Sequence, residues 1–167
     1  MGEEKELMEW NKQAFKDFEP DPIHIPGFVT YYSYRAICSV IAGDIDDGSR
    51  FLNTLLNEIS FKGYSETQME VKILLAVFYG LVDDFELFSQ LAHSIQRQIR
   101  ILGKEKCMHA VYLIKLLKTH FASGKKNKDQ KLQEFLGLIS QNFPSHFSPT
   151  RELFKTGYLE KTLLPEA

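Results

Sequence analysis

The sequence of 167 residues has few of the features that mark catalysis or covalent cross-linking. It contains only two cysteines, Cys38 and Cys107, and both fall in apolar segments where a free cysteine behaves as a small hydrophobic residue. No Cys-x-x-Cys or His-Glu-x-x-His pattern supports a metal site. No glycine-rich loop with the spacing of a P-loop or a dinucleotide site is present to hold phosphate. We therefore expect no enzymatic activity, no cofactor and no metal.

Charge and hydropathy exclude two further classes of protein. A net charge of −2 creates no global field that would attract nucleic acid or an anionic membrane. The chain has no run of about eighteen apolar residues that could cross a bilayer, and no signal-peptide pattern opens it. We expect a cytoplasmic protein without membrane contact. The length suits one domain with a sizeable core.

The clearest pattern in the sequence is helical and lies between residues 65 and 102. Its first part carries apolar residues at offsets of three and four, from Val71 to Leu81. Asp83 and Asp84 interrupt this pattern, as expected of residues that favour turns and cap the first N–H groups of a helix. The apolar pattern then resumes at Phe85. Because the link is short, the stretch predicts an antiparallel helical hairpin.

The same hairpin pattern is repeated on both sides. Segments 30–62 and 105–141 each contain two apolar helical stretches around a turn, and Gly43, Asp83 and Gly124 take equivalent turn positions. The resulting period of roughly forty residues is typical of helical-repeat arrays.

Small residues support this repeat in two of its three copies. Ala36 and Ala76 both stand seven residues before their turns, where a small side chain lets a paired helix approach closely, whereas the third copy has Leu117. The elements predicted in chain order are a helix at 3–18, a proline-rich connector at 19–29, hairpins at 30–62, 65–102 and 105–141, and a capping helix at 149–164.

Within the second hairpin, Ala76, Tyr79 and Asp83-Asp84-Phe85 resemble a tetratricopeptide unit, in which a small residue and an aromatic residue precede a Gly-Asp-aromatic turn. Gly43-Asp44-Ile45 resembles the same turn. The chain from about Tyr31 to Leu164 is also similar, in order and spacing, to the C-terminal portion of a group of large bacterial tetratricopeptide-like proteins without an established activity. No functional residue carries over from this resemblance.

The predicted fold is therefore all-α, a right-handed α-α superhelix of about three antiparallel hairpins with N-terminal and C-terminal capping helices in a single domain, 1–167. It departs from the tetratricopeptide pattern because its period is nearer forty than the usual thirty-four residues. Gly48 and Phe88 also stand where that pattern has alanine.

A helical-repeat fold favours a non-catalytic scaffold that binds a protein or peptide on the concave surface formed by the first helices of the hairpins. The polar and amphipathic residues predicted to line that surface are Tyr32, Arg35, Lys72, Tyr79, Tyr112 and Lys115. The alternative for the tyrosines is packing at the core and its rim. We expect alanine at both Arg35 and Lys72 to weaken partner binding with little loss of thermal stability.

Two alternatives to a scaffold remain. The chain could be a regulatory, sensor or self-associating segment of a larger protein, which would include homo-oligomers. The lysine-rich run Lys125–Lys131 could contact nucleic acid, but it lacks the interleaved aromatic residues of a single-strand binder. Arg97 and Arg100 share a helix face and form a weak basic patch, interpreted as a solvated helix surface.

Overall fold

The computed structural model of the protein describes residues 2–122, 124 and 127–164. These residues form nine α-helices and one short 3-10 helix and contain no β-strand, so the predicted all-α class is confirmed. The chain divides into two compact units, unit 1 (Met1–Tyr64) and unit 2 (Ser65–Ala167). One continuous helical-repeat domain across both units stays a prediction.

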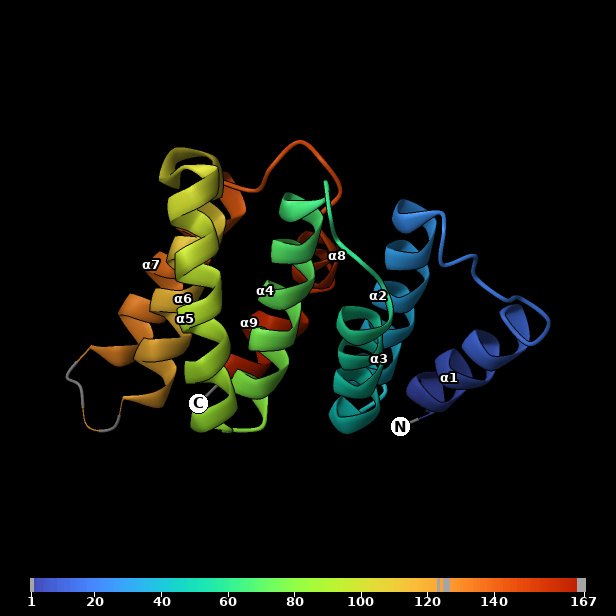
Figure 1. The fold of residues 1–167 in the computed structure, drawn as a ribbon. Coiled ribbons are helices and arrows are strands. Elements are labelled where there is room, and N and C mark those ends of the chain that lie inside the picture. Colours follow the sequence, from blue (N-terminus) through green and yellow to red (C-terminus); the bar gives the residue numbers. More distant parts are fainter. Residues whose placement is uncertain (1, 123, 125–126, 165–167) are drawn as a thin grey trace. The chain divides into compact units, whose positions relative to one another are not determined.

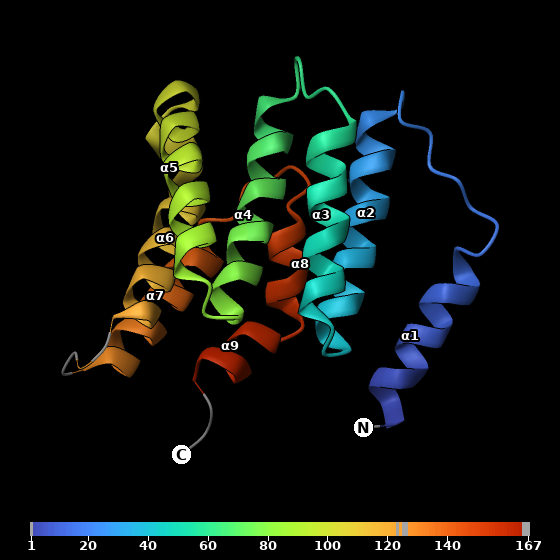
Figure 2. The ribbon, with the colours of Figure 1, turned by 60° about the horizontal axis from the view of Figure 1, so that its bottom comes forward.

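Unit 1 contains α1 (Gly2–Ala14), α2 (Ile25–Ile41) and α3 (Ile45–Glu58), and its core is the hairpin of α2 and α3 (Figure 1). Leu52 and Leu55 of α3 are fully buried in this hairpin. In Figure 2, α1 lies apart from the hairpin at the end of an extended connector. It reaches α2 through edge-to-face contacts of Phe15 with Tyr31 and Tyr34.

The boundaries of α1 and α2 differ from those predicted. The helix expected over 3–18 ends at Ala14, and the following residues form a turn with Phe18 N–H donating to the Phe15 carbonyl. The second helix begins at Ile25, inside the predicted connector 19–29. Proline fits the first turn of a helix, where its missing N–H costs nothing, so Pro26 starts α2 instead of breaking it.

The residues predicted at the three hairpin turns share a positive φ. Gly43, Asp83 and Gly124 all adopt a positive φ, of 89°, 56° and 71° respectively. After the first two of these turns, the carboxylates of Asp44 and Asp84 accept a hydrogen bond from a backbone N–H three residues on and cap α3 and α5. The first two turns therefore share a conformation and a cap, while the equivalence of all three turn positions stays a prediction.

Unit 2 is arranged around one central helix (Figure 1). Its elements are α4 (Ser65–Leu81), α5 (Phe85–Leu102), the 3-10 helix η1 (Lys104–Cys107), α6 (Met108–Phe121), α7 (Lys128–Gln141), α8 (Pro149–Lys155) and α9 (Tyr158–Leu163). α5, α6 and α8 all pack against α4. As a result, most residues of α4 from Met69 to Gly80 are buried, whereas α5 buries a single stripe that includes Phe88 and Ile95.

The single capping helix predicted at 149–164 is two short helices in the structure. Gly157, with a φ of 69°, separates α8 from α9. Ser148 caps α8 and Pro149 follows in its first turn, as the sequence indicates. However, α8 packs against α4, the first helix of the second hairpin. The C-terminal segment therefore covers an inner element of unit 2.

Leu117 is the residue that makes the third repeat irregular, and its packing explains why. A Cβ added at Gly80 would lie 2.6 Å from Leu117 Cδ2, so the glycine leaves the space that the leucine fills. Leu117 is fully buried. The close approach of α4 and α6 is thus made by a small residue on α4 and a large one on α6.

Each unit holds one of the two cysteines, and both are free and buried, Cys38 in α2 and Cys107 in η1. Burial raises the pKa of the Cys107 thiol, and the nearby Glu70 carboxylate raises it further. Burial also raises the pKa of Cys38. Neither thiol is therefore primed as a nucleophile, and each can report the opening of its own unit. None of the helices among the described residues combines the length and the apolar character needed to cross a bilayer.

The fit between Gly80 and Leu117 predicts non-additive mutations. Gly80→Ala should lower the free energy of unfolding by about 1 kcal/mol because its methyl overlaps Leu117. Leu117→Ala should cost about 2–5 kcal/mol. In the Leu117→Ala background, Gly80→Ala should instead stabilise by about 1 kcal/mol, since alanine is the better helix former and fills the cavity. Urea denaturation of the four proteins measures this coupling, and simple additivity would contradict the packing.

Candidate functional site

The six residues predicted to bind a partner are divided between the two units. Tyr32 and Arg35 lie on α2 in unit 1, while Lys72, Tyr79, Tyr112 and Lys115 lie on α4 and α6 in unit 2. All six are on first helices of hairpins, as predicted. Their surroundings differ, and several are engaged in packing inside their own unit.

Arg35 is enclosed by aromatic rings. Its guanidinium carbon lies 4.9 Å from the ring centroid of Phe51, 5.7 Å from that of Tyr31 and 5.9 Å from that of Phe15. One terminal nitrogen donates to the Tyr31 hydroxyl at 2.8 Å. Such cation–π contacts stabilise a fold by about 0.5–2 kcal/mol each, depending on desolvation. Arg35 therefore joins α2, α3 and the turn after α1, and the expectation that it can be removed at little cost to stability is revised.

Tyr32 belongs to the same aromatic cluster. Its ring lies 4.7 Å from Phe28 and 5.2 Å from Tyr31, measured between centroids. Burial raises the pKa of the Tyr32 hydroxyl, and the carboxylate of Glu58 raises it further. The rings favour the packing alternative for this tyrosine over an open binding surface.

Lys72 is held inside its own hairpin. Its ammonium donates to Ser94 Oγ and to Gln98 Oε1, both at 3.2 Å, and both acceptors lie on α5. Partial burial lowers the pKa of Lys72, and the positive charge of Arg97 lowers it further. Lys72 therefore connects α4 to α5.

Lys115 is the most exposed of the predicted residues in unit 2. Its ammonium lies 5.6 Å from the centroid of the Tyr112 ring, one helical turn earlier on α6. Tyr79 and Tyr112 are both half-buried. Of the six residues, Lys115 is the one that leads to a concave surface of unit 2.

That surface is a groove of about 450 Å³ between the C-terminal part of α5 and the outer face of α6. We call it the basic groove. The residues that line it are Gln96, Ile99, Arg100, Lys104, Val111, Ile114, Lys115 and Lys118. Four of these side chains are cationic, three are aliphatic and none is acidic.

The cations of the basic groove have no acidic partner. Among the described residues, no carboxylate lies within 4 Å of Arg100, Lys104, Lys115 or Lys118. Arg100 and Lys115 had each been singled out in the sequence, but for different reasons and in different hairpins. Only the packing of α5 beside α6 brings them to one surface. The one signal in the sequence is the stripe Val111, Ile114, Lys115 and Lys118, whose spacing puts all four on one helix face.

The predicted nucleic-acid run is only partly visible. Lys125 and Lys126 lie outside the described residues, while Lys128 and Lys131 are the start of α7. Neither of these two lines the basic groove.

A buried polar cluster lies elsewhere in unit 2, and sequence reasoning missed it. The Glu70 carboxylate on α4 is 1% exposed, and each of its oxygens has a partner. Oε1 lies 2.6 Å from Nε2 of His109 on α6, which is also buried, and Oε2 accepts from the Ser148 hydroxyl at 2.6 Å. These partners are 39 and 78 residues away in the sequence, so no local pattern could connect them.

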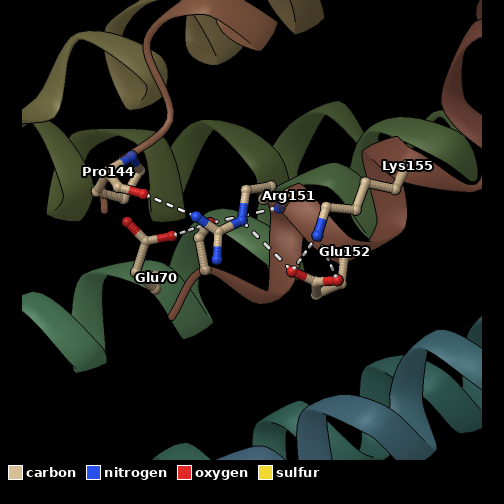
Figure 3. A network of polar contacts seen from close by, with 6 residues as sticks. Glu70, Pro144, Arg151, Glu152 and Lys155 are labelled. Atoms are coloured by element: carbon tan, nitrogen blue, oxygen red, sulfur yellow. Dashed lines mark hydrogen bonds and ion pairs between the residues drawn. The ribbon is translucent and has the colours of Figure 1, made fainter. Parts of the chain in front are cut away.

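The Ser148 hydroxyl is fully engaged in this cluster. It donates to Glu70 and accepts the Arg151 backbone N–H at 3.3 Å, which caps α8. Figure 3 shows the continuation, in which the Arg151 guanidinium donates to the Pro144 carbonyl and to Glu152, and Lys155 also reaches Glu152. Through these contacts the cluster fixes the chain before α8 to α4.

His146 lies at the edge of the cluster, with Nε2 3.8 Å from Glu70 Oε1 and its side chain partly exposed. The Phe143 ring contacts both His109 and Phe154. Within the described part of the chain, no group of three or more His, Cys, Asp or Glu side chains is placed to hold a metal ion.

Comparison of the chain with models of protein families, with curated proteins and with solved structures finds no match. The tetratricopeptide-like relationship therefore stays a prediction.

The aromatic enclosure of Arg35 predicts a stability effect confined to unit 1. Arg35→Ala should lower the free energy of unfolding by about 1–3 kcal/mol, and Arg35→Lys by less, since lysine keeps the charge but loses the planar stacking. Amide hydrogen exchange read by mass spectrometry should show the loss of protection in peptides of α2 and α3. Unchanged protection there would mean that the ring contacts contribute nothing.

The buried cluster predicts a larger effect for Ser148. Ser148→Ala removes a helix cap and leaves a buried carboxylate oxygen unpaired, so it should cost about 2–4 kcal/mol. Native-state alkylation of Cys107 should accelerate by more than about tenfold, because it requires opening of unit 2. Cys38 in unit 1 is the internal reference. Ser140→Ala, on the exposed side of α7, is the matched control and should change the rate little. Equal rates in both variants would show that the cluster does not hold unit 2 together.

Proposed function

We propose that the protein is a non-catalytic scaffold that binds a protein or peptide, built as a right-handed tetratricopeptide-like superhelix. The positive φ shared by Gly43, Asp83 and Gly124 and the close approach of α4 to α6 support the repeat architecture. In such arrays, neighbouring hairpins create extended surfaces suited to binding. A cytoplasmic location and a relationship to bacterial tetratricopeptide-like proteins belong to the same proposal.

The observation that carries the proposal is the basic groove. It lies at the boundary of two successive hairpins, and it combines an aliphatic floor with charged side chains. Its volume of about 450 Å³ suits a few anchoring side chains of a partner. The lining groups recognise shape and charge but include no base or nucleophile paired for catalysis.

Selection from a displayed library of random peptides on the immobilised protein tests the scaffold function without assuming where the partner binds. We expect enrichment of peptides that share a pattern of residues and bind with micromolar dissociation constants in fluorescence anisotropy. Such affinities are typical of short segments that fold or order on binding.

The control for this selection is the same protein unfolded in urea, because a scaffold binds through its folded surface. If no peptide is enriched, or if the enriched peptides bind the unfolded chain equally well, the scaffold proposal is wrong. An enzyme or a purely structural segment would then be the better interpretation.

A further inference from the structure

The basic groove has two chemically distinct surfaces. Val111 forms an aliphatic floor together with Ile99 and Ile114, which are 6% and 4% exposed and present only a small part of their surface. Cations stand on both sides of it, Arg100 and Lys104 from the end of α5 and from η1, and Lys115 and Lys118 from α6. A ligand that fills the groove therefore meets apolar groups below and positive charge on either side.

We propose that the basic groove binds an acidic amphipathic helical segment of a partner protein. This inference rests on the proposed scaffold function and specifies the chemistry of the partner. Glutamate or aspartate side chains of the segment pair with the four cations, and its apolar side chains pack on the three aliphatic residues.

Charge complementarity argues for an acidic partner. Each cation of the groove is exposed, and none has a carboxylate partner among the described residues, so no internal ion pair must break when a ligand binds. Lys115 is already oriented by the Tyr112 ring, which reduces the side-chain entropy lost on pairing. Opposite charge on the partner also steers association and suppresses wrong partners.

The floor argues for an amphipathic segment. Val111, Ile114, Lys115 and Lys118 follow one face of α6 over about 10 Å, which is the length of roughly two helical turns. A helix laid along this stripe presents apolar residues at i, i+3 and i+4 to the floor, as in helix-in-groove recognition.

The same surface is a poor fit for nucleic acid. No aromatic side chain lines the groove, so bases have no ring on which to stack. A peptide with both carboxylates and apolar side chains satisfies both parts of the groove.

The test uses the intact protein and a fluorescein-labelled peptide of about four helical turns, with leucines at i, i+3, i+4 and i+7 and glutamates on both flanks. There are two control peptides. The first has the same residues in scrambled order, and the second has glutamine in place of each glutamate. Arg100→Glu/Lys115→Glu reverses one cation on each side of the groove. Lys128→Glu/Lys131→Glu is the matched control, since it makes the same change in net charge on α7 of the same unit.

We expect the groove variant to bind the amphipathic peptide at least about tenfold more weakly, and the α7 variant to match the unmodified protein within about twofold. Both control peptides should bind at least about tenfold more weakly than the amphipathic one, and rising salt should weaken binding. All four substituted side chains lie on the surface of their helices, so we expect both variants to fold. Unfolding curves of the two variants check this.

Several results would overturn the proposal. Equal binding of the scrambled peptide, or displacement of the peptide by a single-stranded RNA at similar concentration, would make the groove a general polyanion site. A dimer in light scattering that only the groove variant loses would make a second copy of the chain the occupant. If peptides selected from the library bind the groove variant as well as the unmodified protein, the protein is a scaffold but its binding site is not the groove. If the selection enriches no peptide, the scaffold function itself is wrong.

Discussion

Burial of the Glu70 carboxylate is the constraint on which the packing of unit 2 depends. A carboxylate removed from water costs several kcal/mol unless donors replace the lost hydration. The two donors come from different elements, His109 from α6 and Ser148 from the N-cap of α8. The position of α4 therefore sets both the register of α6 and the place to which the chain must return before α8. At its other end, α4 is held to α6 by steric fit, since Gly80 leaves the space that Leu117 fills.

This use of α4 decides which surface of unit 2 is open to a partner. In a simple helical array the first helices of the hairpins line the binding face. Here α8 packs against α4, and the Lys72 ammonium donates its hydrogen bonds to residues of α5. α8 thus covers part of α4, one of the helices on which the predicted binding residues lie. Exposed cationic side chains, Lys115 among them, line the boundary of α5 and α6. The packing around α4 is the reason that the proposed binding surface lies at this hairpin boundary.

The parts of the structure that follow from short-range chemistry could be predicted from the sequence. The turns at Gly43, Asp83 and Gly124 are set by backbone conformation and by the capping aspartates that follow two of them, which a local pattern reveals. Leu117 looked like a defect in the repeat because its complement, Gly80, lies on a different hairpin. Pro26 looked like a helix breaker because only its position in the first turn makes it a helix starter. Glu70 and the basic groove could not be predicted, since their partners meet only after the helices pack.

The electrostatic character of the chain shows why composition was a poor guide to its surface. A net charge of −2 predicts no field, but acidic and basic groups are used differently within unit 2, where some carboxylates have partners inside the fold and others, such as Glu66, Glu105 and Glu134, are exposed. Glu70 is buried and paired, Asp84 caps α5, Asp83 contacts His120, and Glu152 is bound by Arg151 and Lys155. The cations of the basic groove have no such internal task. Folding therefore gathers four unpaired cations on one surface of a chain with a small net negative charge, and this local excess of positive charge is the basis for proposing an acidic ligand.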